Sequence, residues 1–317
     1  MRCEKICKNL KKMILEESFI HGYIHSIFSS AINIIADNGT LISIIKSEKG
    51  IGPYSITIDC EENFLNIPIK TKEEVVISLE MLRFKNFHIN LNTDIPIDLS
   101  IDTLKAKSTN ENFVILDKKI KDLKQYILIN GNTQGILSIL SNIEKGIKYD
   151  DDYAIVNSTY GILIPKINRF IRALKDRTYD DLSIITRDVV GFGIGLTPSS
   201  DDFLCGIMAS LLYGSKFTNY NYEYFLDIFA QMIQKIENNT TLISEKFLLN
   251  SSLGMYPLFM KELCEYIFWE ETYEKVKLRK LLQNTLKFGA TSGTDILCGI
   301  YIGTNIIKDY FGGLGYE

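Results

Sequence analysis

The sequence predicts an α+β protein, in which an N-terminal, mostly antiparallel β domain (a sandwich or small barrel) precedes an all-α C-terminal domain. Apolar and polar residues alternate strictly at 54–60 and 95–102, as in half-buried strands. After about residue 116, the apolar spacing lengthens to that of helix faces. Strands first and helices afterwards favour α+β over a doubly wound sheet.

This change in apolar spacing divides the chain into three predicted segments: a helical extension at 1–18, a β-rich domain at 19–115 and a helical domain at 116–317. The turn Asp37-Asn38-Gly39 predicts a hairpin between strands at 32–35 and 41–45. Apolar periodicity predicts helices at 136–143, 162–174, 201–213, 222–237, 241–250, 257–269, 273–287 and 293–308.

Composition excludes several classes of function. The net charge is −4 and the C-terminal half has no dense basic run, so nucleic acid is not an expected partner. No apolar run is long enough for a transmembrane helix and no signal peptide is evident, so we expect a cytoplasmic protein that does not enter a membrane. The three histidines, His21, His25 and His88, all lie in the first third of the chain. A Ser-His-Asp site built within the C-terminal two-thirds is therefore ruled out.

The most distinctive stretch of the chain is a glycine-rich loop at 191–202, GFGIGLTPSSDD, which leads directly into an apolar segment beginning at Phe203. Glycines at alternate positions let the backbone adopt positive φ and approach a ligand closely. Ser199 or Ser200 is expected to be the N-cap of the helix that follows. Free N–H groups and the positive end of that helix dipole would face whatever the loop encloses.

A second stretch at 289–300, GATSGTDILCGI, repeats the first in register. When Asp295 is aligned with Asp202, the run LCGI follows at the same place in both stretches. Ser292 then falls on Ser199. We infer two similar loop–helix units.

Small residues four apart suggest that the two following helices pack against each other. They are Gly206 with Ser210 on the first helix and Gly299 with Gly303 on the second. The helix N-termini would then be neighbours, and the two loops would form one site for a carboxylate, carbamoyl or phosphate group. The candidate ligand-binding residues are Gly193, Gly195, Thr197, Ser199, Ser200, Asp201, Thr291, Ser292 and Gly293.

Both loops also have a purely structural interpretation. Ser-x-x-Asp begins at Ser199 and at Ser292, and many helices carry this capping-box variant without binding a ligand. Asp201 and Asp202 add negative charge, which opposes anion binding unless a cation compensates for it. The stretch NTTLIS at 239–244 either adds hydroxyls near the site or caps a helix. The spaced glycines and the duplication together favour a functional site.

The motif G-x-G-x-G-L-T-P-S-x-D-D at 191–202 resembles the signature of the AllH-like family, which includes the third subunit of oxamate carbamoyltransferase. The stretch from Gly289 to Gly299 resembles a later block of the same family. Weaker likeness extends over nearly the whole chain from about residue 20.

This resemblance implies a subunit of a multi-subunit carbamoyltransferase of allantoin degradation, within purine catabolism and nitrogen metabolism. Such an enzyme interconverts oxalurate plus phosphate with oxamate plus carbamoyl phosphate, and the other carbamoyltransferase subunits are the implied partners. On this basis, backbone N–H groups of 193–200 and 292–295 bind the anion. Asp202 and Asp295 are the candidate catalytic residues, which orient the loops or transfer a proton.

Two other functions fit the same residues. One is a non-catalytic ligand-binding or scaffolding subunit, which the sequence does not separate from a transferase subunit. The other is a Mg²⁺-dependent hydrolase that uses Asp201, Asp202 and Asp295. Adjacent helical residues point about 100° apart, so joint coordination by Asp201 and Asp202 is awkward. We therefore expect no metal and no cofactor, with Mg²⁺ as the alternative.

Overall fold

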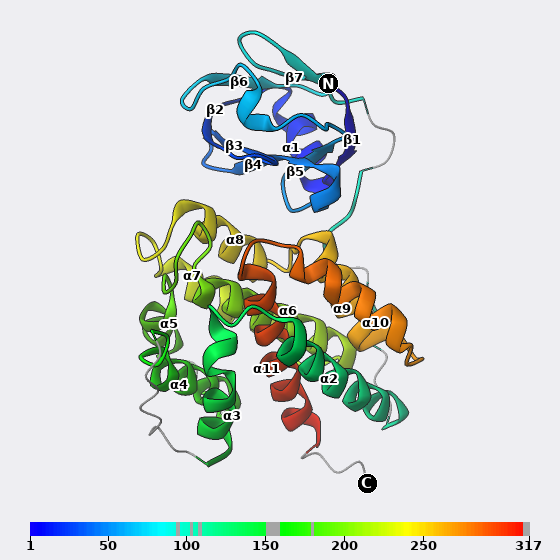
Figure 1. Ribbon diagram of the computed structural model, residues 1–317, viewed down its shortest axis with the longest axis vertical. Helices are drawn as coiled ribbons and strands as arrows, with labels where there is room; N and C mark the ends of the chain where they lie inside the picture. Colours follow the sequence, from blue (N-terminus) through cyan, green and yellow to red (C-terminus); the bar gives the residue numbers. More distant parts are fainter. Residues whose placement is uncertain (93–95, 102–103, 107–109, 150–158, 179–180, 313–317) are drawn as a thin grey trace. The chain divides into compact units, whose positions relative to one another are not determined.

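We analysed a computed structural model, which describes residues 1–92, 96–101, 104–106, 110–149, 159–178 and 181–312. The chain forms two compact units. The N-terminal unit is Met1–Ser100 with Met255–Lys261, and the helical unit is Ile101–Gly254 with the chain from Glu262 onward. The predicted α+β class is confirmed, with the strands in the first unit and most helices in the second (Figure 1).

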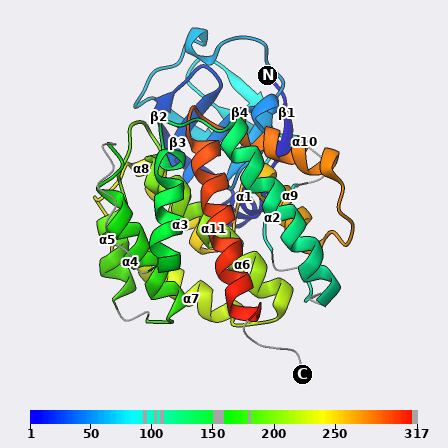
Figure 2. The ribbon, with the colours of Figure 1, turned by 60° about the horizontal axis from the view of Figure 1, so that its bottom comes forward.

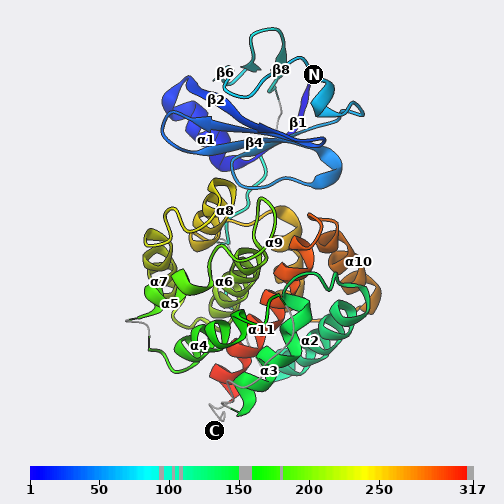
Figure 3. The ribbon, with the colours of Figure 1, turned by 60° about the vertical axis from the view of Figure 1, so that its left-hand side comes forward.

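The N-terminal unit is built on one eight-stranded sheet, in the order β1-β5-β4-β3-β2-β6-β7-β8. Neighbouring strands are antiparallel except β4 and β5. Arg2 bridges Asn90, and the Asn90 amide donates to the Met1 carbonyl at 3.0 Å, so the sheet curls almost into a barrel (Figure 3). The predicted hairpin turn at Gly39 joins β3 to β4. The strands are β1 Cys3–Ile6, β2 Ile20–Ile27, β3 Ala31–Ala36, β4 Leu41–Lys46, β5 Ser55–Ile58, β6 Glu74–Ile77, β7 Met81–Arg83 and β8 His88–Asn90.

The start of the chain differs from the predicted helical extension. Residues 3–6 form β1, which pairs with β5, and helix α1 is confined to Lys8–Glu17. Ile6, Leu10 and Ile14 have helical spacing, and all three lie in the core of the N-terminal unit. Ile6 reaches this core from strand β1, whereas Leu10 and Ile14 reach it from α1. Residues 3–6 form a strand because they pair with the distant strand β5, and local periodicity carries no information about such pairing.

The strand predicted at 95–102 is not formed in the part of that segment that the structure describes. Its one contact of strand type is an isolated bridge from Ile97 to Cys7. The Asp98 side chain accepts a hydrogen bond from the Ser100 amide at 3.0 Å. A local side-chain bond of this kind competes with strand pairing, which explains the failed prediction.

The helices that apolar periodicity predicts are all formed, although residues 136–139 form a 3₁₀ turn and α9 begins in the N-terminal unit. The helical unit also contains α2 and α5, which the periodicity did not indicate. None of the described helices is long and apolar enough to cross a membrane. The helices are α2 Asn110–Asn130, α3 Leu140–Tyr149, α4 Leu163–Lys175, α5 Leu182–Val189, α6 Ser199–Thr218, α7 Tyr222–Gln234, α8 Leu242–Ser252, α9 Leu258–Trp269, α10 Lys275–Leu286 and α11 Ser292–Gly312. Short 3₁₀ turns are η1 Ser47–Lys49, η2 Phe64–Asn66 and η3 Ile136–Ile139.

Helices α6 and α11 run side by side through the middle of the helical unit (Figure 2). They meet at two glycines: a Cβ atom built on Gly299 would lie 2.1 Å from the Phe203 carbonyl oxygen and 3.0 Å from the Cα of Gly206. Farther along both helices, Ser210 donates to the Ile300 carbonyl at 3.0 Å. The contacts advance in the same direction along both helices, so the helices are parallel and their N-termini are neighbours. The predicted packing of this pair is confirmed.

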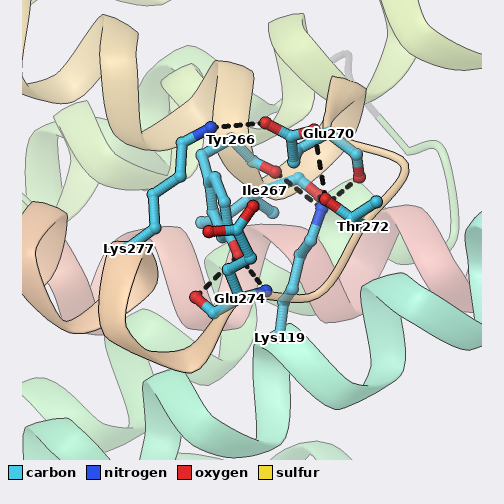
Figure 4. Close-up of polar contacts among 7 residues, drawn as sticks. All are labelled: Lys119, Tyr266, Ile267, Glu270, Thr272, Glu274 and Lys277. Atoms are coloured by element: carbon cyan, nitrogen blue, oxygen red, sulfur yellow. Dashed lines mark hydrogen bonds and ion pairs between the residues drawn. The ribbon is translucent and has the colours of Figure 1, made fainter.

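A buried lysine holds the C-terminal end of α9 (Figure 4). The Lys119 ammonium, on α2, donates to the backbone carbonyls of Tyr266 at 2.7 Å, Ile267 at 3.1 Å and Glu270 at 2.6 Å. Carbonyls at a helix C-terminus have no donor within the helix, so Lys119 supplies one. Burial lowers the pKa of Lys119 to about 8, and the Glu270 carboxylate opposes this shift.

Lys119→Met keeps most of the side-chain length but removes the donor. We expect it to lower the free energy of unfolding by about 2–4 kcal/mol, because two buried carbonyls and a partly buried one lose their partner. Chemical denaturation, with hydrogen exchange at α9, measures the loss. Lys118→Met, at the exposed neighbouring position, is the control and should change stability by less than about 0.5 kcal/mol. Equal stability of the two variants would contradict the role of Lys119.

Candidate functional site

The glycine loop at 191–198 is packed at its base and open at its tip. Gly191, Gly193 and Gly195 all have positive φ, of 82°, 136° and 114°. A Cβ atom on Gly191 would lie 2.1 Å from a backbone carbonyl oxygen, whereas nothing lies within 4 Å of one on Gly195. Ile194, at the tip, is 93% exposed. Gly191 is therefore needed for close packing as well as for its positive φ, whereas Gly195 is needed only for its positive φ.

The two loops that repeat in sequence meet in the structure. The Thr197 and Ser292 hydroxyls, at the N-terminal ends of α6 and α11, lie 3.0 Å apart. Ser292 of α11 lies beside Asp202 of α6, and Ser199 of α6 lies beside Asp295 of α11. Each helix thus supplies a serine to the aspartate of the other. The sequence repeat corresponds to a reciprocal arrangement in space.

The predicted serine caps are wrong for α6. Pro198 occupies the N-cap position, and Ser199 and Ser200 are the first two helical residues. The Ser200 hydroxyl accepts from the Phe192 amide at 2.9 Å, and the Ser199 hydroxyl lies 3.2 Å from that of Tyr160. The two hydroxyls therefore connect α6 to the glycine loop and to Tyr160, and do not cap their own helix.

Several backbone amides that were predicted to bind an anion are used within the protein. The amides of Ser200, Gly293 and Asp295 donate to backbone carbonyls at 3.0, 2.8 and 3.0 Å. The positive ends of the two helix dipoles still point into this region. Any ligand held here would rely more on hydroxyl groups, including Thr197 and Thr291, than the sequence suggested.

Asp201 ties the glycine loop to the start of α8. Its carboxylate accepts from the Gly191 amide at 2.7 Å and from the hydroxyls of Ser200 at 3.2 Å, Thr240 at 2.5 Å and Ser244 at 2.6 Å. Burial raises the pKa of Asp201, and these four donors oppose the rise. The carboxylate is fully used inside the protein, so its role is to shape the loop.

The stretch 239–244 both caps a helix and places hydroxyls near the glycine loop, which are the two interpretations that its sequence allowed. Thr241 is the N-cap of α8 and accepts from the Ser244 amide at 3.1 Å. The Thr241 hydroxyl also donates to the Leu196 carbonyl of the glycine loop. The segment therefore begins a helix and holds the loop in place.

Asp202 and Asp295 are fully buried but lack the donors that surround Asp201. Among the described residues, neither carboxylate oxygen of Asp202 has a hydrogen bond of good geometry, and the same is true of Oδ2 of Asp295. Oδ1 of Asp295 accepts from the Ile136 amide at 2.7 Å. These two carboxyl groups, one from each helix, are the chemically unusual groups of the site.

Burial sets the protonation of this pair. It raises the pKa of Asp202 well above its usual range; the Ser292 hydroxyl opposes the rise and the charge of Asp295 adds to it. Burial also raises the pKa of Asp295 to about 7, against the Ser199 hydroxyl and the Ile136 amide. Burial thus favours the uncharged form of both carboxyl groups, and Asp295 titrates near neutrality.

A loop that the sequence analysis did not single out completes the site. It carries the Ile136 amide that bonds Asp295, and a Cβ atom on Gly135 would lie 2.3 Å from Asp295 Oδ1. The Asn132 amide donates to the Thr294 hydroxyl at 3.0 Å. Its sequence, GNTQG, has the composition of a turn, but nothing in it indicates which distant residue the turn contacts.

The arrangement gives little support to the Mg²⁺ hydrolase. Both oxygens of Asp201 already accept protein donors, so Asp201 is not available as a ligand. In the described ranges, no three His, Cys, Asp or Glu side chains gather into a group that could hold a metal ion.

A cavity of about 640 Å³ lies elsewhere in the helical unit, at the C-terminal end of α6. Its lining includes Ser215, Lys216 and Tyr222 and none of the residues of the two loops. The cavity is therefore separate from the buried carboxyl pair.

Two family models match the chain. A model described as oxamate carbamoyltransferase subunit AllH matches residues 189–304, which include both loops and all of α6. A model described as the AllH family N-terminal domain matches residues 3–98, which include every strand of the sheet. No solved structure matches the chain.

Proposed function

From the membership of this chain in the AllH family, we propose that it is a subunit of a carbamoyltransferase and that the joined N-termini of α6 and α11 form its small-ligand site. The observation that carries the proposal is the buried pair Asp202 and Asp295, each beside a serine of the other helix. A duplicated capping motif without function would not leave two carboxyl groups buried and short of donors.

The reaction that the family resemblance implies needs a proton to move. The carbamoyl carbon of oxalurate loses its bond to the amide nitrogen and gains one to a phosphate oxygen. Phosphate gives up its proton as it attacks, and the departing nitrogen gains one to leave as oxamate. A carboxyl group that titrates near neutrality suits this transfer, and the pKa of Asp295 is about 7.

The burial of Asp202 also weakens the objection that acidic residues repel an anion. Burial raises the pKa of Asp202 well above its usual range, which favours the uncharged form of its carboxyl group. The remaining negative charge faces the positive ends of α6 and α11. Hydroxyls of Thr197, Ser199 and Ser292 supply further contacts for a small anionic substrate.

The test is an activity assay of the chain purified alone and co-expressed with the products of the genes beside its own. We expect no activity alone and carbamoyl transfer in the complex. The double variant Asp202→Asn, Asp295→Asn should lower kcat of the complex by about 10²–10⁴-fold. Asp188→Asn, an exposed position on α5, is the matched control and should leave kcat unchanged.

The same assay separates the non-catalytic alternative. If the double variant assembles and folds normally and keeps full activity, the proposed catalytic site is wrong. If the variant forms less complex but each assembled complex keeps a normal kcat, the chain is a scaffolding or ligand-binding subunit.

A further inference from the structure

Two hydroxyl groups in series lead from the buried Asp295 to a half-buried tyrosine. The Asp295 carboxyl group lies beside Ser199, and the Ser199 hydroxyl lies 3.2 Å from the hydroxyl of Tyr160. Asp295 is 0% exposed and Ser199 is 1% exposed, whereas Tyr160 is half-buried. Because Asp295 has no exposed surface, a proton reaches it only through neighbouring groups. The hydroxyls of Tyr160 and Ser199, which we call the hydroxyl series, offer such a route.

The sequence repeat indicates that Tyr160 takes the place of a missing hydroxyl. In the equivalent arrangement on the other helix, Ser292 lies beside Asp202, and its hydroxyl lies 3.0 Å from that of Thr197. The alignment of the two loops places residue 290 on Thr197, and residue 290 is alanine. The second loop therefore has no hydroxyl at this position. Tyr160, from a segment outside the repeat, supplies one.

Contacts with two segments hold Tyr160 in place. Its ring lies edge-to-face on that of Phe192 in the glycine loop, with 5.6 Å between the ring centroids and an interplanar angle of 71°. Its carbonyl accepts from the Leu163 amide at 2.9 Å, at the start of α4. The phenol is thus anchored by its ring and its backbone, and its hydroxyl is left to contact Ser199.

Asp295 is able to receive a proton from this direction. Its Oδ1 accepts from the Ile136 amide at 2.7 Å, whereas Oδ2 has no hydrogen bond of good geometry among the described residues. A hydroxyl rotates about its C–O bond, so the Ser199 proton can turn from Tyr160 toward Asp295. Burial raises the pKa of Asp295 to about 7, so both of its forms are populated near neutrality.

We infer that Tyr160 is a further functional residue of the proposed site, and that it conducts protons between solvent and Asp295 through the hydroxyl of Ser199. This inference rests on the proposed function, in which Asp295 transfers a proton. In one direction, an acid in the solvent protonates the Tyr160 oxygen, the phenol proton passes to Ser199, and the serine proton passes to the Asp295 carboxylate. Each O–H bond that breaks is replaced by one that forms, so both hydroxyls are restored and Asp295 gains one proton. Tyr160 acts through Ser199 and is therefore a positioning residue.

Carbon NMR of the full chain, labelled with ¹³C at the aspartate carboxyl groups, tests the inference without a partner subunit or a substrate. The Asp295 signal is identified by its loss in Asp295→Asn. In the parent, fast proton exchange should give one signal that moves smoothly as the pH passes about 7. Tyr160→Phe keeps the ring contact with Phe192 and should leave the midpoint unchanged. It should slow the exchange at least about tenfold, seen as a broadened or split signal at the midpoint.

Two further variants frame this comparison. Tyr224→Phe removes the hydroxyl of an exposed tyrosine on α7 and is the matched control, which should behave as the parent. Ser199→Ala interrupts the hydroxyl series at its other member and should also slow the exchange, so it serves if Tyr160→Phe fails to fold. In the complex with partner subunits, Tyr160→Phe should lower kcat at least about tenfold and change KM by less than about twofold.

Slow exchange of Asp295 in the parent, or equal exchange in the parent and in the variants of the hydroxyl series, would overturn the inference. A midpoint that moves in Tyr160→Phe at an unchanged exchange rate would overturn it too, because Tyr160 would then only shape the surroundings of Asp295. Slower exchange in Tyr160→Phe, together with a parent complex that lacks transferase activity, would refute the proposed function and leave the hydroxyl series standing. An active complex with unchanged exchange would do the reverse.

Discussion

Asp295→Asn is expected to make the protein more stable than its parent above pH 7, by about 2–4 kcal/mol at pH 8. The cause is the burial that raises the pKa of Asp295 to about 7. Above that pH, folding must keep a buried charge that has too few donors. Asparagine has the same shape and no charge, and its oxygen can still accept from the Ile136 amide.

The direction of the pH dependence follows from the number of bound protons. The unfolded carboxyl group loses its proton near its ordinary pKa of about 4, whereas the folded one keeps it up to about 7. Between these values the folded state binds more protons, so the stability of the parent protein falls as pH rises through this window. Asp295→Asn should remove this slope and match the parent near pH 4.

Denaturant titrations from pH 4 to 8, with hydrogen exchange at α6 and α11, measure both effects. The neighbouring carboxylate provides a contrast: Asp201→Asn replaces an acceptor of four donors and should destabilise at every pH. A destabilising effect of Asp295→Asn at pH 8, similar to that of Asp201→Asn, would mean that Asp295 is an ordinary structural residue.

Gly299→Ala is expected to cost at least about 3 kcal/mol, although alanine favours helices by about 1 kcal/mol. The new Cβ atom would lie 2.1 Å from the Phe203 carbonyl oxygen and 3.0 Å from the Cα of Gly206, which are backbone atoms that do not rotate away. Helices α6 and α11 would have to separate. Their N-termini, and with them the contact between Thr197 and Ser292, would separate too.

The comparison with Gly214→Ala isolates this backbone contact. The three atoms nearest to a Cβ atom at position 214, also on α6, are side-chain atoms of Ile307, the nearest at 2.5 Å, and a side chain can change rotamer. We expect a cost of less than about 2 kcal/mol there, measured as the shift of the denaturation midpoint. Equal costs at the two positions would show that the helices do not need the glycine contact.

Local pattern was sufficient for most of the fold and for the pairing of the two loops. Strand alternation and helical periodicity indicated the order of the two units, and the repeated Ser-x-x-Asp and LCGI runs indicated paired loops and helices. The two failures have different physical causes. Residues 3–6 became a strand because β5 is available to pair with it, and 96–101 did not form one because Asp98 bonds its own backbone nearby.

The sequence by itself determined the bounds of the predicted helices only approximately and did not indicate α2 and α5. It did determine that two loops of the same kind precede two helices with glycines on one face. Only the tertiary structure decided which acid does what. Asp201 and Asp202 are adjacent and chemically identical, yet one faces four donors and the other faces the second helix with no donor of good geometry among the described residues. The difference arises because a carboxyl group acquires its charge and its role from the groups around it, and those groups come from segments far apart in the chain.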